Sequence, residues 1–241
     1  ALAAGGLRQI GYNGGQVNNA GTYVRNGLGS TVAENLNNSG TVLVQSGALG
    51  LHDNFVNTGT LRIDSGARVY GVDFVLNNAG LLTGTGTVQT QSNSAALNNT
   101  GTIDPGSVGT GPTGTLTLIG DLLMGAGSGL HIDFGSSGAA DQLAIGDGAT
   151  WGGTLAVWAP SDRVFTRGES FVIATFGQRI GSSTFSGISW LGDGLNPFSV
   201  VYNANDITLT VTSAVPEPGT WALWLAGSAA LLGLMRRRRK A

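Results

Sequence analysis

The sequence predicts an all-β protein: a right-handed parallel β-helix (solenoid) with coils of about 20 residues, a C-terminal β-rich cap and then a single C-terminal hydrophobic helix. Three observations lead to this prediction. A short motif recurs five times at nearly equal spacing, alternating apolar runs follow the copies, and an uncharged segment precedes five consecutive cations near residue 241.

The repeated motif has an Asn two residues before a Gly and an apolar residue four residues before the same Gly. The glycines are 19, 19, 21 and 21 residues apart, and periods of this length are typical of solenoids. The five Asn and Gly pairs are Asn19 and Gly21, Asn38 and Gly40, Asn57 and Gly59, Asn78 and Gly80, and Asn99 and Gly101.

The residues after these glycines favour strands, because they alternate and contain many β-branched side chains, as in Thr41–Val44 and Thr60–Ile63. Turn residues such as Ser46-Gly47 and Ser65-Gly66 follow them. Equivalent residues of a parallel β-helix stack from coil to coil, so the apolar residues four before and two after each Gly should face the interior.

Stacking should also bring the five Asn side chains into a ladder of amides bonded along the axis. Asn and the Gly after it both tolerate left-handed turn conformations, which suits a turn at this position. A sugar-binding or ion-binding stripe is the functional alternative for the Asn row.

The pattern changes after Pro105, where strand-like runs with Gly turns continue and longer runs appear from about residue 165. This region resembles the C-terminal coils and cap of autotransporter passenger domains, including the stretches that begin at Asp141 and Gly152. The resemblance implies a β-helix closed by a β-rich cap. We expect repeats over residues 1–110, terminal coils and cap over 111–213, and a separate C-terminal segment over 214–241.

The C-terminal segment has three blocks in order. Pro216, Glu217 and Pro218 form an extended box, because proline lacks a backbone donor and disfavours helix in the residue before it. An uncharged stretch of 15 residues, Trp221–Met235, then spans about 22 Å as a helix, short of the ~30 Å bilayer core. The residues assigned to this membrane segment are Trp221, Ala222, Leu223, Trp224, Leu225, Leu231, Leu232, Leu234 and Met235.

Five cations close the segment: Arg236, Arg237, Arg238, Arg239 and Lys240. Clustered Lys and Arg beside a membrane helix stay cytoplasmic, so this cluster should act as a stop and place the body on the far side of the inner membrane. We therefore expect a marginal membrane span that holds the precursor.

These three blocks, with Gly233-Leu234 near the end of the apolar stretch, resemble the PEP-CTERM sorting signal of Gram-negative bacteria. The resemblance implies recognition by exosortase, a membrane-embedded cysteine protease that removes the tail near the Pro-Glu-Pro box. It also implies release or transfer to the cell surface or extracellular matrix, in association with exopolysaccharide and biofilm. Such a protein needs an export signal upstream of Ala1, so we expect the chain to be a processed or truncated fragment.

Composition excludes several classes of function. The chain has no Cys, which excludes a disulfide scaffold, thiol catalysis and thiolate metal sites. Before Pro216 it has seven cations against 13 acids, a net charge of −6, so a nucleic-acid partner is not expected.

No catalytic centre is predicted either. Carbohydrate-active enzymes on β-helices need converging carboxylates. Asp53, Asp64, Asp73 and Asp104 stand at different offsets from the repeat glycines, and we interpret them as scattered turn and surface residues.

The two histidines, His52 beside Asp53 and His131 two residues before Asp133, are interpreted as satisfied or exposed side chains. Neither a metal nor a cofactor is therefore predicted. The sequence points to a non-enzymatic, exported structural or adhesive protein. A carbohydrate-active enzyme on the same solenoid and an autotransporter-like adhesin passenger are the alternatives.

Overall fold

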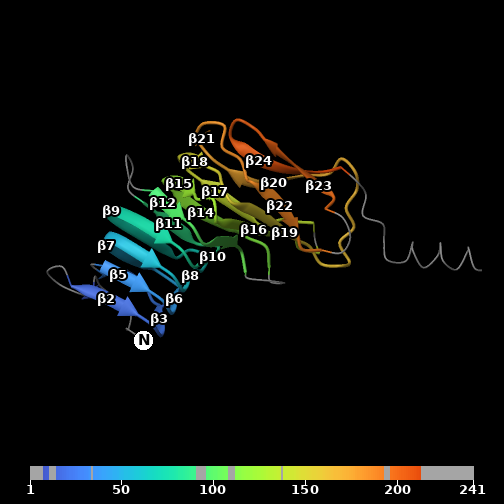
Figure 1. The fold of residues 1–241 in the computed structure, drawn as a ribbon. Coiled ribbons are helices and arrows are strands. Elements are labelled where there is room, and N and C mark those ends of the chain that lie inside the picture. Colours follow the sequence, from blue (N-terminus) through green and yellow to red (C-terminus); the bar gives the residue numbers. More distant parts are fainter. Residues whose placement is uncertain are drawn as a thin grey trace, which may run out of the picture.

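The computed structural model describes residues 8–10, 15–33, 35–90, 96–107, 112–136, 138–192 and 196–212. These residues form an all-β solenoid, in which strands of successive coils stack side by side (Figure 1). The colours of Figure 1 pass from blue at one end to red at the other, so the stack follows the order of the chain. The predicted all-β solenoid is confirmed, while its right-handed sense stays a prediction.

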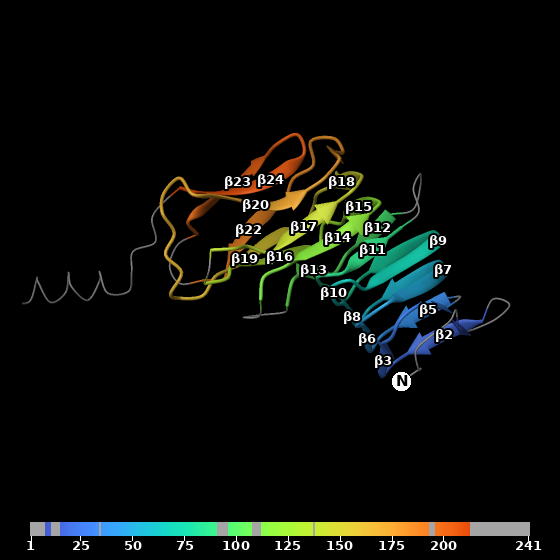
Figure 2. The ribbon, with the colours of Figure 1, turned by 180° about the vertical axis from the view of Figure 1, so that it is seen from behind.

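A sheet of eight parallel strands runs along the solenoid (Figure 2). In spatial order it contains β22 (Gly187–Trp190), β19 (Thr154–Trp158), β16 (Gly129–Asp133), β13 (Thr102–Pro105), β10 (Leu81–Gly84), β8 (Thr60–Ile63), β6 (Thr41–Val44) and β3 (Thr22–Arg25). Each strand therefore belongs to a different coil.

The second sheet has 16 strands in two rows, because the long strands β7 and β9 each pair with two shorter strands. One row contains β1 (Arg8–Ile10), β4 (Ser30–Ala33), β11 (Thr87–Gln89), β14 (Thr115–Ile119), β17 (Gln142–Ile145) and β20 (Ser170–Thr175). The other row contains β2 (Gln16–Asn19), β5 (Asn35–Asn38), β12 (Ala96–Asn99), β15 (Asp121–Met124), β18 (Gly148–Thr150) and β21 (Gln178–Arg179). The long strands β7 (Ala48–Asn57) and β9 (Arg68–Asn78) belong to both rows and join them. The first row is extended by β23 (Phe198–Tyr202) and β24 (Asp206–Val211).

The core is the predicted stack of apolar repeat positions. Four residues before the glycines, Leu36 pairs with Phe55, and Leu76 pairs with Leu97; all are at most 2 % exposed. The residues two after the glycines, Val42, Leu61, Leu82 and Ile103, are fully buried and stack in the other sheet. Each coil thus contributes apolar side chains from both sheets to one continuous core.

The repeat asparagines form a continuous ladder beside this core. The Nδ2 atoms of Asn19, Asn38, Asn57 and Asn78 each donate to Oδ1 of the next Asn at 2.7 Å. The same nitrogens also contact backbone carbonyls of their own coil and of the next one, such as Gly59 and Leu81 for Asn57. The ladder ends at Asn99, because Met124 occupies the next position in register and has no amide.

The repeat glycines allow adjacent coils to approach closely. The sequence predicted instead that glycine is needed here for a left-handed turn conformation, and the structure corrects this. None of Gly21, Gly40, Gly59, Gly80 and Gly101 has a positive φ, whereas the turn glycines Gly47 and Gly66 have φ of 70° and 75°. A Cβ on Gly59 would collide with the carbonyl oxygen of Gly40 in the preceding coil, and Gly40, Gly80 and Gly101 meet the same obstacle. Only the absence of a side chain lets the coils stack at this corner.

Coil length changes after β13. The step from Leu81 to its neighbour Thr102 is 21 residues, whereas the step from Thr102 to Gly129 is 27. The next coil also contains an inserted hairpin, closed by a bridge between Phe134 and Ala140. These additions create the local environment of the candidate site.

Antiparallel strands close the C-terminal end. β20 pairs in parallel with β17 but antiparallel with β24, and β24 pairs antiparallel with β23. Four phenylalanine rings, Phe134, Phe165, Phe171 and Phe198, pack against one another beneath these strands with centroid separations of 4.8–6.5 Å. The last coil is therefore covered by strands instead of ending in an open apolar layer.

Candidate functional site

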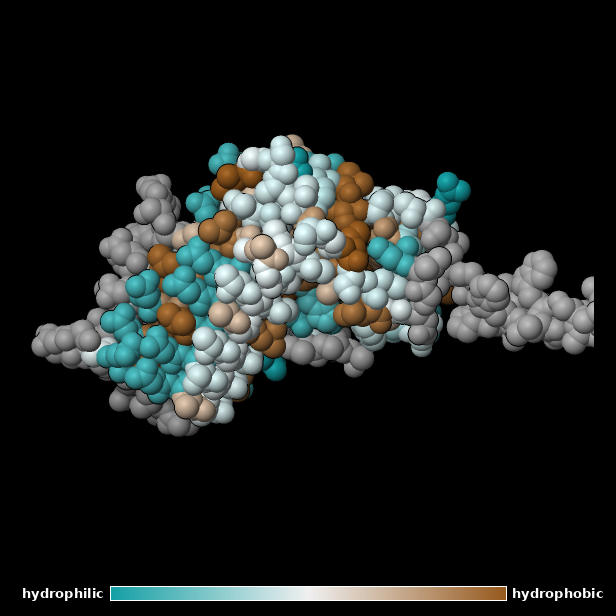
Figure 3. Space-filling model, viewed as in Figure 1, coloured by the Kyte–Doolittle hydropathy of each residue, from teal (hydrophilic) through white to brown (hydrophobic). Residues whose placement is uncertain are grey.

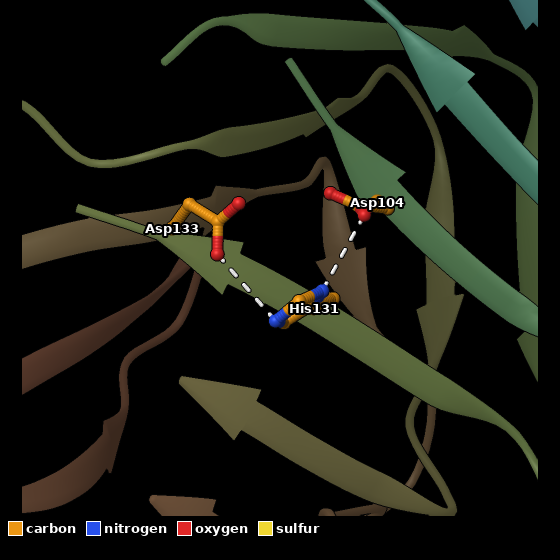
Figure 4. A group of neighbouring side chains, drawn as sticks. All are labelled: Asp104, His131 and Asp133. Carbon is orange, nitrogen blue, oxygen red and sulfur yellow. Dashed lines mark hydrogen bonds and ion pairs between the residues drawn. The ribbon is translucent and has the colours of Figure 1, made fainter. Parts of the chain in front are cut away.

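Three ionisable side chains gather on the outer face of the eight-stranded sheet: Asp104 on β13, and His131 and Asp133 on β16 (Figure 4). The two strands are neighbours, with Ile103 opposite Leu130. Both of these apolar residues are fully buried in the core, so alternation puts Asp104 and His131, one residue later, on the opposite face. Asp133 follows His131 by two residues and shares that face.

The imidazole of His131 lies between the two carboxylates. Its Nδ1 is 3.4 Å from Oδ2 of Asp104, and its Nε2 is 3.4 Å from Oδ1 of Asp133. One potential ligand atom from each of the three residues lies within 4.8 Å of the others. Both carboxylate side chains are 3 % exposed and the imidazole is 24 % exposed, so solvent reaches the group from the His131 side. We name these three residues the histidine–carboxylate cluster.

Several oxygens of the cluster have no hydrogen-bond partner among the residues that the structure describes. They are Oδ1 of Asp104 and both carboxylate oxygens of Asp133. Buried charged oxygens without donors are costly, because they have lost water and gained no replacement. Among the described residues, the two carboxylates of the cluster are therefore short of hydrogen-bond donors.

A third carboxylate, Asp141, lies next to the cluster in the inserted region and is fully buried. Its Oδ1 accepts from the backbone N–H of Gly114 at 2.7 Å, and its Oδ2 accepts from the N–H of Asp133 at 3.1 Å. Both of its oxygens are thus occupied by backbone donors. Asp141 ties the inserted hairpin to the strand that carries Asp133.

The electrostatic environment favours an added positive charge. Burial raises the pKa of Asp133 to about 6 and that of Asp141 to about 7, because the charged carboxylates have lost solvent. The hydrogen bond to Asp104 is the main cause that raises the pKa of His131, with the nearby charges of Asp133 and Asp141 adding to it. All three shifts favour the protonated form of these groups.

Asp104 corrects an expectation from the sequence, since this residue is 2 % exposed rather than a surface residue. Asp64 is indeed at the surface, where its Oδ1 accepts from Nε of Arg62 at 2.7 Å. The side chains of His52, Asp53 and Asp73 lie outside the described part of the chain.

A local signal for the cluster existed in the sequence. Two residues separated by one position on a strand share a face, which is the spacing of His131 and Asp133. The repeat does not predict the contact between Asp104 and His131. These residues are 27 positions apart, whereas the repeat periods are 19 and 21 residues.

The Asn ladder does not offer a ligand stripe. Asn38, Asn57, Asn78 and Asn99 are at most 1 % exposed, and the amides of the first three each donate to the next Asn and to the backbone. A sugar in solvent has no access to them. The buried asparagines of the row therefore connect neighbouring coils of the fold and do not bind a ligand from solvent.

The predicted sorting residues, from the Pro216–Pro218 box to Lys240, lie outside the described residues. Among the residues that the structure does describe, no helix combines the length and the apolar character needed to cross a membrane. The case for the tail therefore comes from sequence.

Residues 214–240 match the family described as the PEP-CTERM protein-sorting motif. No curated protein matches the chain. The matched residues include all three blocks: the Pro-Glu-Pro box, the apolar stretch and the cation cluster. Such a motif implies export, a C-terminal membrane-anchoring signal and recognition by an exosortase. The chain is therefore a β-solenoid protein that carries a PEP-CTERM protein-sorting signal at residues 214–240.

Proposed function

We propose that this chain is a non-enzymatic structural or adhesive protein of the cell surface or the extracellular matrix, where it associates with exopolysaccharide in biofilm. The observation that carries the proposal is the PEP-CTERM motif at residues 214–240. Exosortase is the processing partner, and it removes the tail near the Pro-Glu-Pro box. The precursor waits in the inner membrane with residues 236–240 on the cytoplasmic side, because clustered cations do not cross a bilayer.

The shape of the body supports a structural role. A stack of coils gives a long, regular surface rather than a single deep site. A second row of asparagines, one residue before the buried ladder, faces outward: Asn37 donates to Asn18 at 3.2 Å, and Asn98 donates to Asn77 at 3.0 Å. Figure 3 shows hydrophilic residues gathered toward the end of the solenoid that holds β2 and β5. Neutral amides of this kind can exchange hydrogen bonds with glycan hydroxyl groups.

Processing can be tested in the native producer. Replacing the three residues of the Pro-Glu-Pro box with Ala should leave the precursor in the membrane fraction, and Pro160→Ala, outside the matched segment, should not. Mass spectrometry of the released protein should find no peptide from Trp221–Ala241. Normal release of the triple variant, or an intact tail on extracellular protein, would contradict the sorting assignment.

The enzymatic alternative predicts a different result. A carbohydrate-active enzyme on this scaffold would depend on carboxylates, and Asp104 and Asp133 are two that the structure brings together. We expect no breakdown of acidic or neutral glycans by the purified protein. Glycan cleavage that is abolished by Asp104→Asn or by Asp133→Asn would replace the structural role by an enzymatic one.

A further inference from the structure

We propose that the histidine–carboxylate cluster binds one divalent transition-metal ion, such as Zn²⁺. The ligands are one imidazole nitrogen of His131 and one carboxylate oxygen each from Asp104 and Asp133. Solvent, which reaches the cluster from the His131 side, completes the coordination. This inference rests on the residues of the solenoid and is independent of the sorting signal.

The ligand types select the class of ion. Two carboxylates neutralise a divalent cation, and an imidazole nitrogen suits Zn²⁺, Ni²⁺ or Cu²⁺. Ca²⁺ and Mg²⁺ instead prefer oxygen ligands in larger number. One nitrogen and two carboxylates from three residues therefore favour a transition-metal ion over the hard cations.

The separations are close to those of a bound site. Ligands bonded at about 2.0–2.2 Å in a tetrahedral arrangement lie about 3.3–3.6 Å apart. Nδ1 of His131 lies 3.4 Å from Oδ2 of Asp104, and Nε2 lies 3.4 Å from Oδ1 of Asp133, so each ring nitrogen faces one carboxylate. One ligand atom from each of the three residues lies within 4.8 Å of the others, so binding of a single ion requires side-chain rotation that brings both carboxylates to the same ring nitrogen.

The unpartnered oxygens are the second, independent observation. The Asp133 side chain is 97 % buried, and its Oδ2 has no partner in the described part of the structure. Oδ1 of Asp104 also has no hydrogen-bond partner among the described residues. A cation bound at this place would supply the missing positive charge to both carboxylates.

Asp141 acts as a positioning residue. It accepts a hydrogen bond from the backbone of Asp133 and another from Gly114, so it holds the strand that carries a ligand against the inserted region. Groups behind the ligands commonly fix their orientation in metal sites.

The site would cross-link adjacent coils. Asp104 lies on β13 and His131 and Asp133 lie on β16, which are joined through a 27-residue coil. A chain without Cys has no disulfide to restrain such a coil, and a metal bound only by the folded state adds its binding free energy to stability.

The test uses the full chain in mild detergent, stripped with EDTA and then titrated with Zn²⁺. We expect about one Zn²⁺ per chain by elemental analysis after desalting, and a higher unfolding temperature with Zn²⁺ than with Ca²⁺. Asp133→Asn and His131→Asn should lose the bound Zn²⁺ and the thermal shift. The matched controls are Asp162→Asn, on an exposed turn, and His52→Asn, which removes the other histidine; both should bind as the unchanged protein does.

Spectroscopy of the unchanged protein keeps the proposal testable if a ligand variant fails to fold. Cu²⁺ bound in place of Zn²⁺ should show coupling to one imidazole by pulsed EPR, and this signal should persist in His52→Asn. No bound metal after titration, binding unchanged in a folded Asp133→Asn variant, or an imidazole signal that is lost in His52→Asn would each overturn the site. A thermal shift produced equally by Ca²⁺ would overturn the assignment to a transition metal.

Discussion

Replacing Asn57 with Ala tests how much one step of the amide ladder stabilises the solenoid. Asn57 is fully buried. Its Nδ2 donates to Oδ1 of Asn78 at 2.7 Å and also contacts two backbone carbonyls. Its Oδ1 accepts from Nδ2 of Asn38 at 2.7 Å. An amide has two hydrogens, so the substitution removes about three effective hydrogen bonds, worth ~3 kcal/mol together. It also leaves the buried Oδ1 of Asn78 without its donor, which adds ~1–3 kcal/mol.

We therefore expect Asn57→Ala to lower the free energy of unfolding by about 4 kcal/mol or more. The matched control is Asn37→Ala, which removes an amide of the outer row bonded to Asn18 at 3.2 Å and should cost less than about 1 kcal/mol. Asn57→Asp is a second variant of the same shape. It keeps the acceptor for Asn38 but places two oxygens against each other at the Asn78 contact, so it should destabilise at least as much as Ala at neutral pH.

Urea unfolding of the full chain in mild detergent, followed by far-UV circular dichroism, gives the differences from the shift in midpoint at a common slope. Repeat proteins can unfold in parts, so hydrogen exchange of the Gly59 and Gly80 amides provides a local measure. These amides donate to carbonyls of the preceding coil and should lose protection first in Asn57→Ala. If Asn57→Ala and Asn37→Ala are equally stable, the ladder does not hold the coils together and the reasoning fails.

Three further outcomes follow from the same structure. Gly59→Ala should destabilise the fold by roughly 1–3 kcal/mol or more, because the added Cβ meets a backbone carbonyl of the preceding coil. The control is Gly21→Ala, since a Cβ on Gly21 meets nothing within 4 Å. Equal thermal midpoints for the two variants would contradict this. In EDTA, the free energy of unfolding should fall as pH rises from about 4 to about 7. The pKa values of Asp133, Asp141 and His131 are raised in the folded state, so the folded state holds protons more tightly than the unfolded state and loses this advantage as the pH rises. Urea midpoints across this range measure the slope, and a rise in stability would refute the sign. Asp133→Asn removes a buried charge that lacks donors, so without metal it should flatten this slope and be more stable than the unchanged protein at pH 8; lower stability there would show that the ionised carboxylate is a net benefit.

The regular half of the protein was predictable because its signals are local and periodic. An Asn two residues before each Gly and apolar residues on both sides of it recur at 19 or 21 residues, and stacking converts such a period directly into a ladder and a core. The physical reason for the glycines was not predictable in the same way. It depends on the distance between a turn and the carbonyl of the preceding coil, which no single coil contains.

The histidine–carboxylate cluster was missed for a related reason. Asp104 stands three residues after the last repeat glycine and does not align with the carboxylates of earlier coils, while its partners are one long coil later in the chain. Its place beside His131 depends on the strand register across a 27-residue coil, which has no periodic signature.

The sequence by itself determined that the protein carries a sorting signal and that its body is a solenoid, because a sorting signal is read as a linear segment and a solenoid repeats one local pattern. The PEP-CTERM motif at residues 214–240 and the five Asn-containing repeats needed no coordinates. Only the tertiary structure decided which polar groups are sealed inside and which charges meet. Adjacent parallel strands place Asp104 beside His131 although 27 residues separate them, and burial then leaves carboxylate oxygens of this group without hydrogen-bond partners among the described residues.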